Sequence, residues 1–188
     1  DLETEEGQEL FRRLVKTAQV MVEDKPPGYL DELGLGYPEL KEINLGLVMA
    51  SVTGFGQNGP YSDYKSCDMV VSALGGQMYV NGEAETPPLK PYGDQTYYSA
   101  SLFAAIGIML ALWNRHTTGK GQHIDVSAMD CATATLDHVL VRYFYEVTVA
   151  GRQGSRHWNN AFSVFPCRDG YILLSLLHQW ETMVEWLD

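Results

Sequence analysis

The chain has 188 residues, of which 45% are hydrophobic and 20% are charged, which is the composition of a globular protein with a packed core. Its 24 acidic and 13 basic side chains give a formal net charge of −11. Such a charge excludes a general electrostatic attraction to nucleic acid or to an anionic membrane surface, so we expect neither as a partner. Local donors must therefore hold any anionic ligand.

The three cysteines, Cys67, Cys131 and Cys167, are far apart in the sequence and form no CxxC pair. The 5 histidines show neither HxxxH nor HxH spacing. This pattern predicts no metal site and no disulfide framework, and it favours a reducing, cytoplasmic location. The longest apolar run, residues 100–113, is shorter than a bilayer span, and the acidic opening of the chain is unlike a signal peptide.

The first elements alternate between helix and strand. An amphipathic helix capped by Thr4 precedes a short strand at residues 20–22, short helices at 29–33 and 38–43, and a strand at 47–53. This order is typical of β-α-β units, in which parallel strands carry ligands at their carboxyl ends. We therefore expect an α/β fold with an open, mostly parallel, Rossmann-like sheet.

A long central helix is predicted from about residue 94 to residue 113, because apolar residues recur there at helical spacing. We expect this helix to be largely buried. A glycine turn then leads into a strand at 123–127, and a second long helix is predicted at about 129–145. Two strands, at 162–166 and 170–175, are predicted to form a hairpin.

The predicted elements divide the chain into two parts. Residues 1–150 are expected to form a larger, nucleotide-binding-like domain. Residues 151–188 are expected to form a linker and the start of a smaller α+β domain that begins with the hairpin.

The segment from Gly54 to Gly59 has the G-x-G-x-x-G spelling of a dinucleotide-binding turn. In that motif the third glycine enters a helix whose N-terminus faces the pyrophosphate. Here residues 60–64 continue as a turn, and the next helical pattern begins near Asp68. We therefore favour a glycine-rich turn that lines a cleft, with a dinucleotide-dependent oxidoreductase as the alternative.

Asp94 follows Gly93 and opens the central helix. The partial positive charge at a helix start favours an ionised carboxylate. Two interpretations fit this placement. Asp94 is either an ordinary N-cap, since aspartate is a preferred capping residue, or a carboxylate that is presented for chemistry.

Several stretches of the sequence, in one collinear order, are similar to family III CoA-transferases, which include formyl-CoA and carnitine CoA-transferases. They are YLDELGLGY at 29–37, SVTGFGQNGPY at 51–61, Gly93-Asp94 before an Ala-Ile-Gly-Ile-rich helix, RHTTGKGQHIDV at 115–126 and FPCRDGY at 165–171. The resemblance covers nearly the whole chain. Family members are longer, so it implies a larger domain incomplete at its N-terminus and a smaller domain incomplete at its C-terminus. It also implies an interlocked homodimer.

The resemblance implies an acyl-CoA:carboxylate CoA-transferase in which Asp94 is the nucleophile. The carboxylate would attack the thioester of an acyl-CoA, pass through a mixed anhydride to an aspartyl-CoA thioester, and then transfer CoA to a small carboxylic acid. This is covalent catalysis by a carboxylate. Coenzyme A is then a substrate, and no tightly bound cofactor or metal is implied.

The resemblance also implies supporting residues. Lys65 matches a lysine beside the CoA cleft, although a solvated surface lysine is the alternative, and Asp68 matches an acidic position near the reacting centre, although a helix cap is the alternative. Tyr92 and Gly93, which flank the nucleophile, are assigned to substrate or CoA binding. The turn at 23–28 matches a CoA-contacting loop in which a basic residue is replaced here, so Lys25 is the candidate for its phosphate contact.

Two further alternatives stay open. The family contains α-methylacyl-CoA racemases, which carry a histidine immediately before the acidic residue that Asp68 matches. This chain has Cys67 there, so proton transfer at the α-carbon loses one partner and transfer is favoured over racemisation. The second alternative is a catalytically silent fragment that binds CoA.

Overall fold

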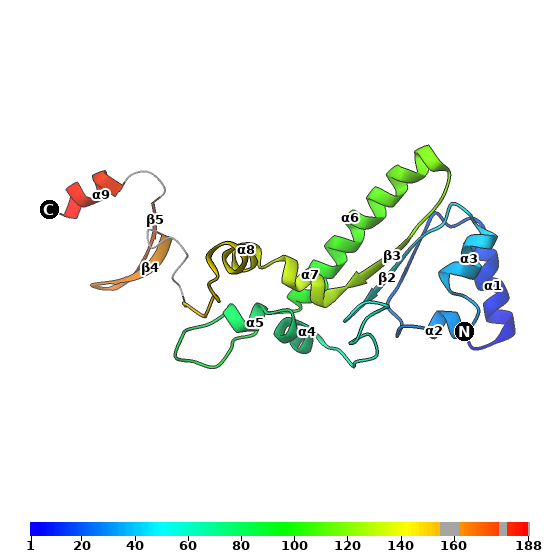
Figure 1. Cartoon of the computed structure of the whole chain (residues 1–188), viewed down its shortest axis with the longest axis horizontal. Helices are drawn as coiled ribbons and strands as arrows, with labels where there is room; N and C mark the ends of the chain where they lie inside the picture. Colours follow the sequence, from blue (N-terminus) through cyan, green and yellow to red (C-terminus); the bar gives the residue numbers. More distant parts are fainter. Residues whose placement is uncertain (155–161, 177–179, 188) are drawn as a thin grey trace.

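The computed structural model describes residues 1–154, 162–176 and 180–187. The described elements, in chain order, are α1 (Glu5–Val15), β1 (Val20–Glu23), α2 (Tyr29–Glu32), α3 (Tyr37–Ile43), β2 (Val48–Thr53), α4 (Asp68–Leu74), α5 (Gln77–Val80), α6 (Gln95–Thr118), β3 (His123–Ser127), α7 (Ala128–Ala134), α8 (Asp137–Glu146), β4 (Phe162–Cys167), β5 (Gly170–Ser175) and α9 (Trp180–Leu187) (Figure 1). The strands β1, β2 and β3 form one parallel sheet in that order. The predicted α/β fold with a parallel sheet is therefore confirmed.

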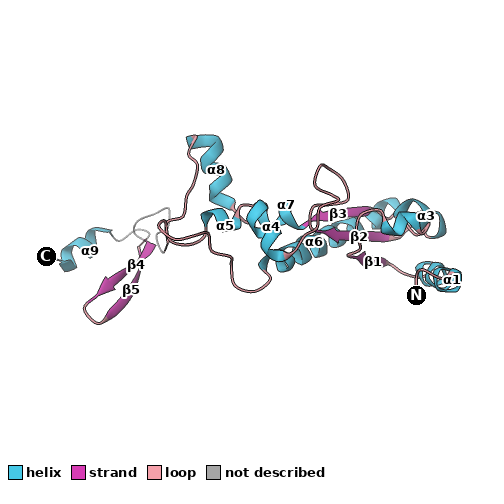
Figure 2. Ribbon diagram, turned by 90° about the horizontal axis from the view of Figure 1, so that it is seen from below, coloured by secondary structure: helices cyan, strands magenta, loops and turns pink. Residues whose placement is uncertain are grey.

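The two faces of this sheet are covered by different helices. Val52, Ile124 and Val126 pack with buried residues of α4, α6 and α7. Alternate residues of a strand point to opposite faces, so Leu47 and Met49 lie on the other side, where they pack with α1, α2 and α3. Figure 2 shows the three strands side by side. Helices cover both faces of β2, and residues 48–51 are accordingly all buried.

The beginning of α1 confirms the predicted cap. The Thr4 side chain accepts a hydrogen bond from the Gly7 N–H at 3.2 Å, so it satisfies one of the free donors at the helix start. The bounds of β1, α2, α3 and β2 agree with the predicted elements to within one or two residues.

The burial of α6 differs from the prediction. A stripe of small residues, Ala100, Ala104, Gly107 and Ala111, faces the sheet, and a Cβ at Gly107 would lie 3.0 Å from Ile124 Cγ2. These small side chains allow α6 to approach the sheet closely. The large apolar residues that were expected in the core are exposed instead: Leu102, Phe103, Ile106, Met109, Leu110 and Trp113. The expectation of a largely buried helix was therefore wrong for this chain.

By length and composition alone, α6 is the one helix in the described part of the chain that could cross a membrane. The helix has 24 residues and extends well beyond the apolar run at 100–113. That run alone was expected to be too short to span a bilayer. The core helix of a globular protein meets the same criterion, so length and composition do not assign a location to α6.

The second long helix predicted at about 129–145 is two helices, α7 and α8, and the prediction of one helix was wrong. The break falls at Thr135, whose hydroxyl donates to the Ala132 carbonyl at 2.6 Å and accepts from Gln77 Nε2 at 2.9 Å. Threonine side chains compete with the helical backbone for hydrogen bonds in this way. The turn is closed by the Leu136 N–H, which donates to the Thr133 carbonyl.

The predicted hairpin is present as the antiparallel pair β4 and β5, with Cys167 opposite Gly170. Figure 1 shows the hairpin and α9 at the opposite end of the molecule from α1. Part of the predicted linker, residues 155–161, lies outside the described residues. The division into domains at residue 150 stays a prediction.

Gly121, in the turn before β3, gives the first testable prediction. A Cβ there would lie 1.8 Å from the Leu47 carbonyl oxygen, so Gly121→Ala must push two backbone segments apart. We expect a loss of about 1–3 kcal/mol in the free energy of unfolding, measured by urea denaturation. Gly151→Ala is the control, since a Cβ there meets nothing within 4 Å. Equal stability of the two variants would contradict the prediction.

Candidate active site

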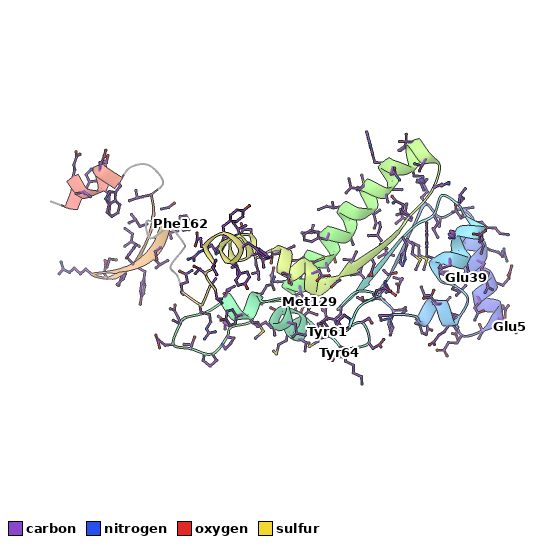
Figure 3. The ribbon with its side chains drawn as sticks, viewed as in Figure 1. Glu5, Glu39, Tyr61, Tyr64, Met129 and Phe162 are labelled. Atoms are coloured by element: carbon purple, nitrogen blue, oxygen red, sulfur yellow. The ribbon has the colours of Figure 1, made fainter. Side chains whose placement is uncertain are left out.

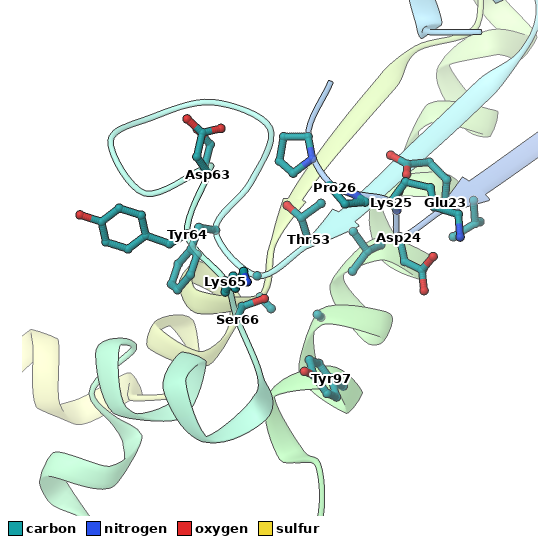
Figure 4. A pocket seen from close by; sticks show the side chains of 18 of the residues that line it. Glu23, Asp24, Lys25, Pro26, Thr53, Asp63, Tyr64, Lys65, Ser66 and Tyr97 are labelled. Carbon is teal, nitrogen blue, oxygen red and sulfur yellow. Dashed lines mark hydrogen bonds between the residues drawn. The ribbon is translucent and has the colours of Figure 1, made fainter. Parts of the chain in front are cut away.

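A large cavity lies at the carboxyl ends of β1 and β2, where a parallel α/β sheet is expected to bind ligands. Its volume is about 1100 Å³. Its wall is formed by the end of β1 with the following loop (residues 22–27), the end of β2 with the following turn (residues 52–55), and residues 62–66 before α4. Tyr97, Ala100 and Ser101 of α6 and Ala128 of α7 complete it. Figure 4 shows the segment at Glu23–Pro26 and the segment at Asp63–Ser66 on opposite sides of Thr53. The cavity therefore lies between the sheet, α6 and two loops.

The cavity wall carries charges of both signs. Lys25 and Lys65 line it from opposite loops, together with the carboxylates of Glu23, Asp24 and Asp63. The Glu23 carboxylate accepts a hydrogen bond from the Lys25 backbone N–H at 2.7 Å, which fixes the turn that carries the lysine. The two predicted lysines are thus brought to a single cavity, although they are 40 residues apart in the sequence.

Thr53, the last residue of β2, contributes a buried hydroxyl to this wall. Among the described residues, Thr53 Oγ1 has no hydrogen-bond partner. Buried polar groups normally have a partner, so this hydroxyl is available to a ligand in the cavity. Its position at the carboxyl end of a predicted parallel strand was the one signal that pointed to Thr53.

The glycine-rich segment at 54–59 forms a turn, and the next helix is α4. Both oxygens of the Asp125 carboxylate accept the Gln57 N–H, at 2.9 and 3.0 Å, and hold this turn against β3. The prediction of a turn without a following helix is confirmed, so the turn lacks the helix N-terminus that a dinucleotide-binding motif requires.

Aromatic side chains gather beside this turn. The rings of Tyr61 and Tyr64 have centroids 5.3 Å apart, and both rings contact buried Phe55. Figure 3 shows Tyr61 and Tyr64 next to each other below Met129. Tyr64 and Phe55 also line the cavity, so this cluster forms part of its rim.

Asp94 occupies the N-cap position of α6, as predicted, but its side chain makes no capping hydrogen bond. The residue is exposed, and the preceding Gly93 has a φ of +73°, a conformation that favours glycine. Asp94 does not line the cavity, which begins one turn further along α6 at Tyr97. The carboxylate therefore stands free at the helix start, beside the cavity.

Asp68 caps α6 instead. It is the first residue of α4 and is only 7% exposed. One carboxylate oxygen, Oδ1, accepts from the Thr96 N–H at 3.1 Å and from the Thr96 hydroxyl at 2.6 Å, while Oδ2 contacts Lys90 Nζ at 2.6 Å. Burial by itself would raise the pKa of Asp68, but the hydrogen bonds from Lys90 and Thr96 outweigh it and lower the pKa below its ordinary value.

Tyr97 lies between these carboxylates and the cavity. Burial raises the pKa of its hydroxyl, and the negative charges of Cys67, Asp68 and Asp94 in their ionised forms add to this effect. The hydroxyl therefore stays protonated at neutral pH and can donate a hydrogen bond. Tyr97 was not predicted as a site residue, although its position three residues after Asp94, one helical turn away, was a signal.

The other predicted residues lie outside the cavity wall. Tyr92 is 97% exposed, and its backbone carbonyl accepts from Gln95 Nε2 at 2.9 Å. Asp68, Gly93 and Asp94 lie together at the start of α6. The next residue of this helix region that lines the cavity is Tyr97. The structure thus forms two adjacent groups, the two lysines at the cavity and the carboxylates at the helix start.

The parallel sheet, with helices on both faces and a cavity at the carboxyl ends of two of its strands, has the arrangement in which α/β proteins bind ligands. The chain belongs to CoA-transferase family III, whose sequence profile matches residues 1–188. The resemblance noted from the sequence is therefore confirmed.

Curated relatives of the chain are CoA-transferases. It is 36% identical over its full length to succinyl-CoA:(R)-benzylsuccinate CoA-transferase subunit BbsE of Thauera aromatica, covering 47% of that protein. It is 37% identical over 90% of its length to acetyl-CoA:oxalate CoA-transferase of Acetobacter aceti, covering 44% of it. It is 33% identical over 89% of its length to human succinyl-CoA:glutarate CoA-transferase, covering 39% of it. The chain thus spans less than half the length of these relatives.

Solved structures show the same fold. A CaiB/BaiF family protein from Brucella suis is 38% identical, with a TM-score of 0.85 over 93% of this chain and 47% of that protein. A protein from Mycobacterium tuberculosis is 26% identical, with a TM-score of 0.84 over 98% of this chain and 49% of that one.

Proposed function

We propose that this chain carries the nucleophile and part of the CoA site of an acyl-CoA:carboxylate CoA-transferase. The observation that carries the proposal is the Asp94 carboxylate, which begins α6 exposed and without a capping bond beside a cavity of about 1100 Å³. An ordinary N-cap would be bound to the helix backbone. Here Asp68 accepts the Thr96 N–H, and this leaves Asp94 free to react.

The reaction proceeds by covalent catalysis in four steps. An Asp94 oxygen attacks the thioester carbon, the C–S bond breaks, and CoA leaves as a thiolate from a mixed anhydride. The thiolate attacks the Asp94 carbonyl carbon, so the donor acid departs as its carboxylate and an aspartyl-CoA thioester forms. The acceptor carboxylate then attacks this thioester and releases the thiolate again. Attack of the thiolate on the acceptor's carbonyl carbon yields the new acyl-CoA and restores Asp94.

The chain's own groups support this sequence of steps. The partial positive charge at the start of α6 favours an ionised Asp94 and opposes the negative charge that develops on the carbonyl oxygen. Tyr97 stays protonated, so its hydroxyl can donate a hydrogen bond to the carbonyl oxygen of a bound thioester. Thr53 Oγ1 can form a hydrogen bond with an acyl or pantetheine group.

The named relatives use succinyl-CoA or acetyl-CoA with a dicarboxylate. We extend this substrate class to the protein, and we take succinyl-CoA as the first donor to test. Incubation with succinyl-CoA followed by hydroxylamine should convert Asp94 to its hydroxamate, detected by peptide mass spectrometry. Binding of CoA with an unmodified Asp94 would instead support the silent, CoA-binding alternative.

The lysines at the cavity give a second prediction. Lys25→Ala and Lys65→Ala should each weaken CoA binding by roughly tenfold, since each removes a charged donor that can meet a phosphate oxygen. Isothermal titration calorimetry measures this, with Lys41→Ala on the distant helix α3 as the control for charge. An unchanged Kd for either cavity variant would remove that lysine from the CoA site.

A further inference from the structure

We propose that Lys90 is a positioning residue for the nucleophile: with Asp68 and Thr96 it caps α6 from outside the helix and holds the loop that ends at Asp94. This inference rests on the proposed function, because it assigns the cluster a purpose in presenting Asp94. The residues come from three segments, namely the start of α4, the loop before α6 and the first turn of α6.

The cap of α6 is supplied by a residue outside the helix. An N-cap side chain usually accepts the N–H of the second or third helical residue. In α6 the second residue is Thr96, which is fully buried, and both its N–H and its hydroxyl donate to Asp68 Oδ1. Asp68 lies 28 residues earlier in the chain. The capping bond is therefore already made when Asp94 meets a substrate, and no donor of Thr96 competes for the nucleophile.

Lys90 also holds the loop that leads to Asp94. An ammonium group has three N–H donors, and the geometry of Lys90 commits its Nζ to three acceptors. These are Asp68 Oδ2 at 2.6 Å, the Pro91 carbonyl at 3.1 Å and the Gly93 carbonyl. Two of the three residues that precede Asp94 are thus tied by their carbonyls to the same ammonium that is paired with the cap. Lys90 is not a cavity-lining residue, which separates it from Lys25 and Lys65.

The contacts of Lys90 bear on the reaction because they fix the position of Asp94. Removal of the Lys90 charge releases both carbonyls and leaves Asp68 without its ion pair, so the backbone at Gly93 and Asp94 can relax. The Asp94 carboxylate is then no longer held in one orientation at the start of α6. A displacement of about 1 Å of a reacting group can cost on the order of 100-fold in rate. The effect falls on the covalent step and not on CoA binding.

The test compares Lys90→Met with Lys41→Met, which removes a lysine charge on the exposed side of α3. The rate of Asp94 hydroxamate formation is measured at saturating succinyl-CoA and is normalised to the folded fraction. For Lys90→Met we expect a fall of about 10- to 100-fold. The Kd for CoA should stay within about twofold of the wild-type value, as it should for Lys41→Met. An unchanged rate per folded molecule would overturn the proposal.

A second pair of variants separates positioning from simple destabilisation. Thr96→Ser keeps the hydroxyl that Asp68 accepts and should retain the wild-type rate, whereas Thr96→Val loses the hydroxyl and should slow the covalent step. Equal rates per folded molecule for these two variants would show that the hydroxyl only stabilises the fold, and this would overturn the role of Thr96.

Amide hydrogen exchange at Thr96 tests the cap without any turnover. Asp94→Ala should leave the protection of this amide within about twofold of the wild type, whereas Lys90→Met should lower it. Loss of protection in Asp94→Ala would overturn the cap arrangement and leave the proposed function standing. Absence of any adduct in the wild-type protein would overturn the proposed function, and with it a catalytic purpose for the cluster.

Discussion

Asp94→Ala is expected to abolish hydroxamate formation and to reduce CoA transfer by at least about 10⁴-fold, because the variant lacks the oxygen that attacks the thioester. Peptide mass spectrometry after incubation with succinyl-CoA and hydroxylamine measures the first effect, and release of CoA measures the second. The Kd for CoA should change little, since Asp94 lies outside the cavity wall. The loss is therefore expected in kcat and not in binding.

The stability of the same variant distinguishes the two interpretations of Asp94. Loss of an N-cap aspartate costs about 0.5–2 kcal/mol in the free energy of unfolding. Asp94 is exposed and makes no capping bond, so we expect Asp94→Ala to stay within about 0.5 kcal/mol of the wild type. Two results would contradict the assignment of Asp94 as a free nucleophile. One is a full yield of hydroxamate in the variant, and the other is a fall in its free energy of unfolding as large as that for the loss of an N-cap.

Asp68→Ala should lower the free energy of unfolding by about 3 kcal/mol at pH 7, because it strands a lysine and a buried threonine that were bonded to the carboxylate. This loss is near the lower end of the range for a broken buried ion pair, because the Lys90 side chain is 26% exposed and solvent weakens the pair. Urea denaturation measures the loss. Asp31→Ala, at an exposed site in α2, is the control and should fall within about 0.5 kcal/mol of the wild type.

The pH dependence of this effect has a defined sign. The pKa of Asp68 is lower in the folded protein than its ordinary value, which is about 3.9 in an unfolded chain. The folded state therefore gains stability that is complete above about pH 4 and is lost as the pH falls through the folded pKa. The difference between the wild type and Asp68→Ala should narrow in acid. A difference that is constant from pH 7 to pH 3 would contradict the assigned cause.

Much of the fold could be predicted from local sequence patterns. The strand β2 is mostly apolar and is followed by Gly54, and α1 begins at a threonine cap. The orientation of α6 could not be predicted in this way. Its apolar residues lie on every side, so the pattern has no polar face from which the buried side can be read. The small-residue stripe faces the sheet because it allows the closest approach.

Only those features of the candidate site that depend on local sequence pattern could be predicted. The position of Asp94 at a helix start follows from local pattern, whereas its assignment as a nucleophile came from a resemblance to a family. The bond between Asp68 and Thr96 joins two segments that are distant in sequence, and no local pattern reports such a contact. Lys90 was missed because a lysine in a polar, proline-bearing loop carries no signal of its own. A homodimer and a cytoplasmic location stay predictions.

The cap that Asp68 supplies has a practical consequence. One acidic residue secures the end of the helix and a different one is left to react, so chemistry and folding can be altered independently at this place. An Asp94 variant should then stay folded and bind an acyl-CoA without cleaving its thioester. Crystals of such a protein soaked with succinyl-CoA would reveal where the acyl chain lies before any bond is broken.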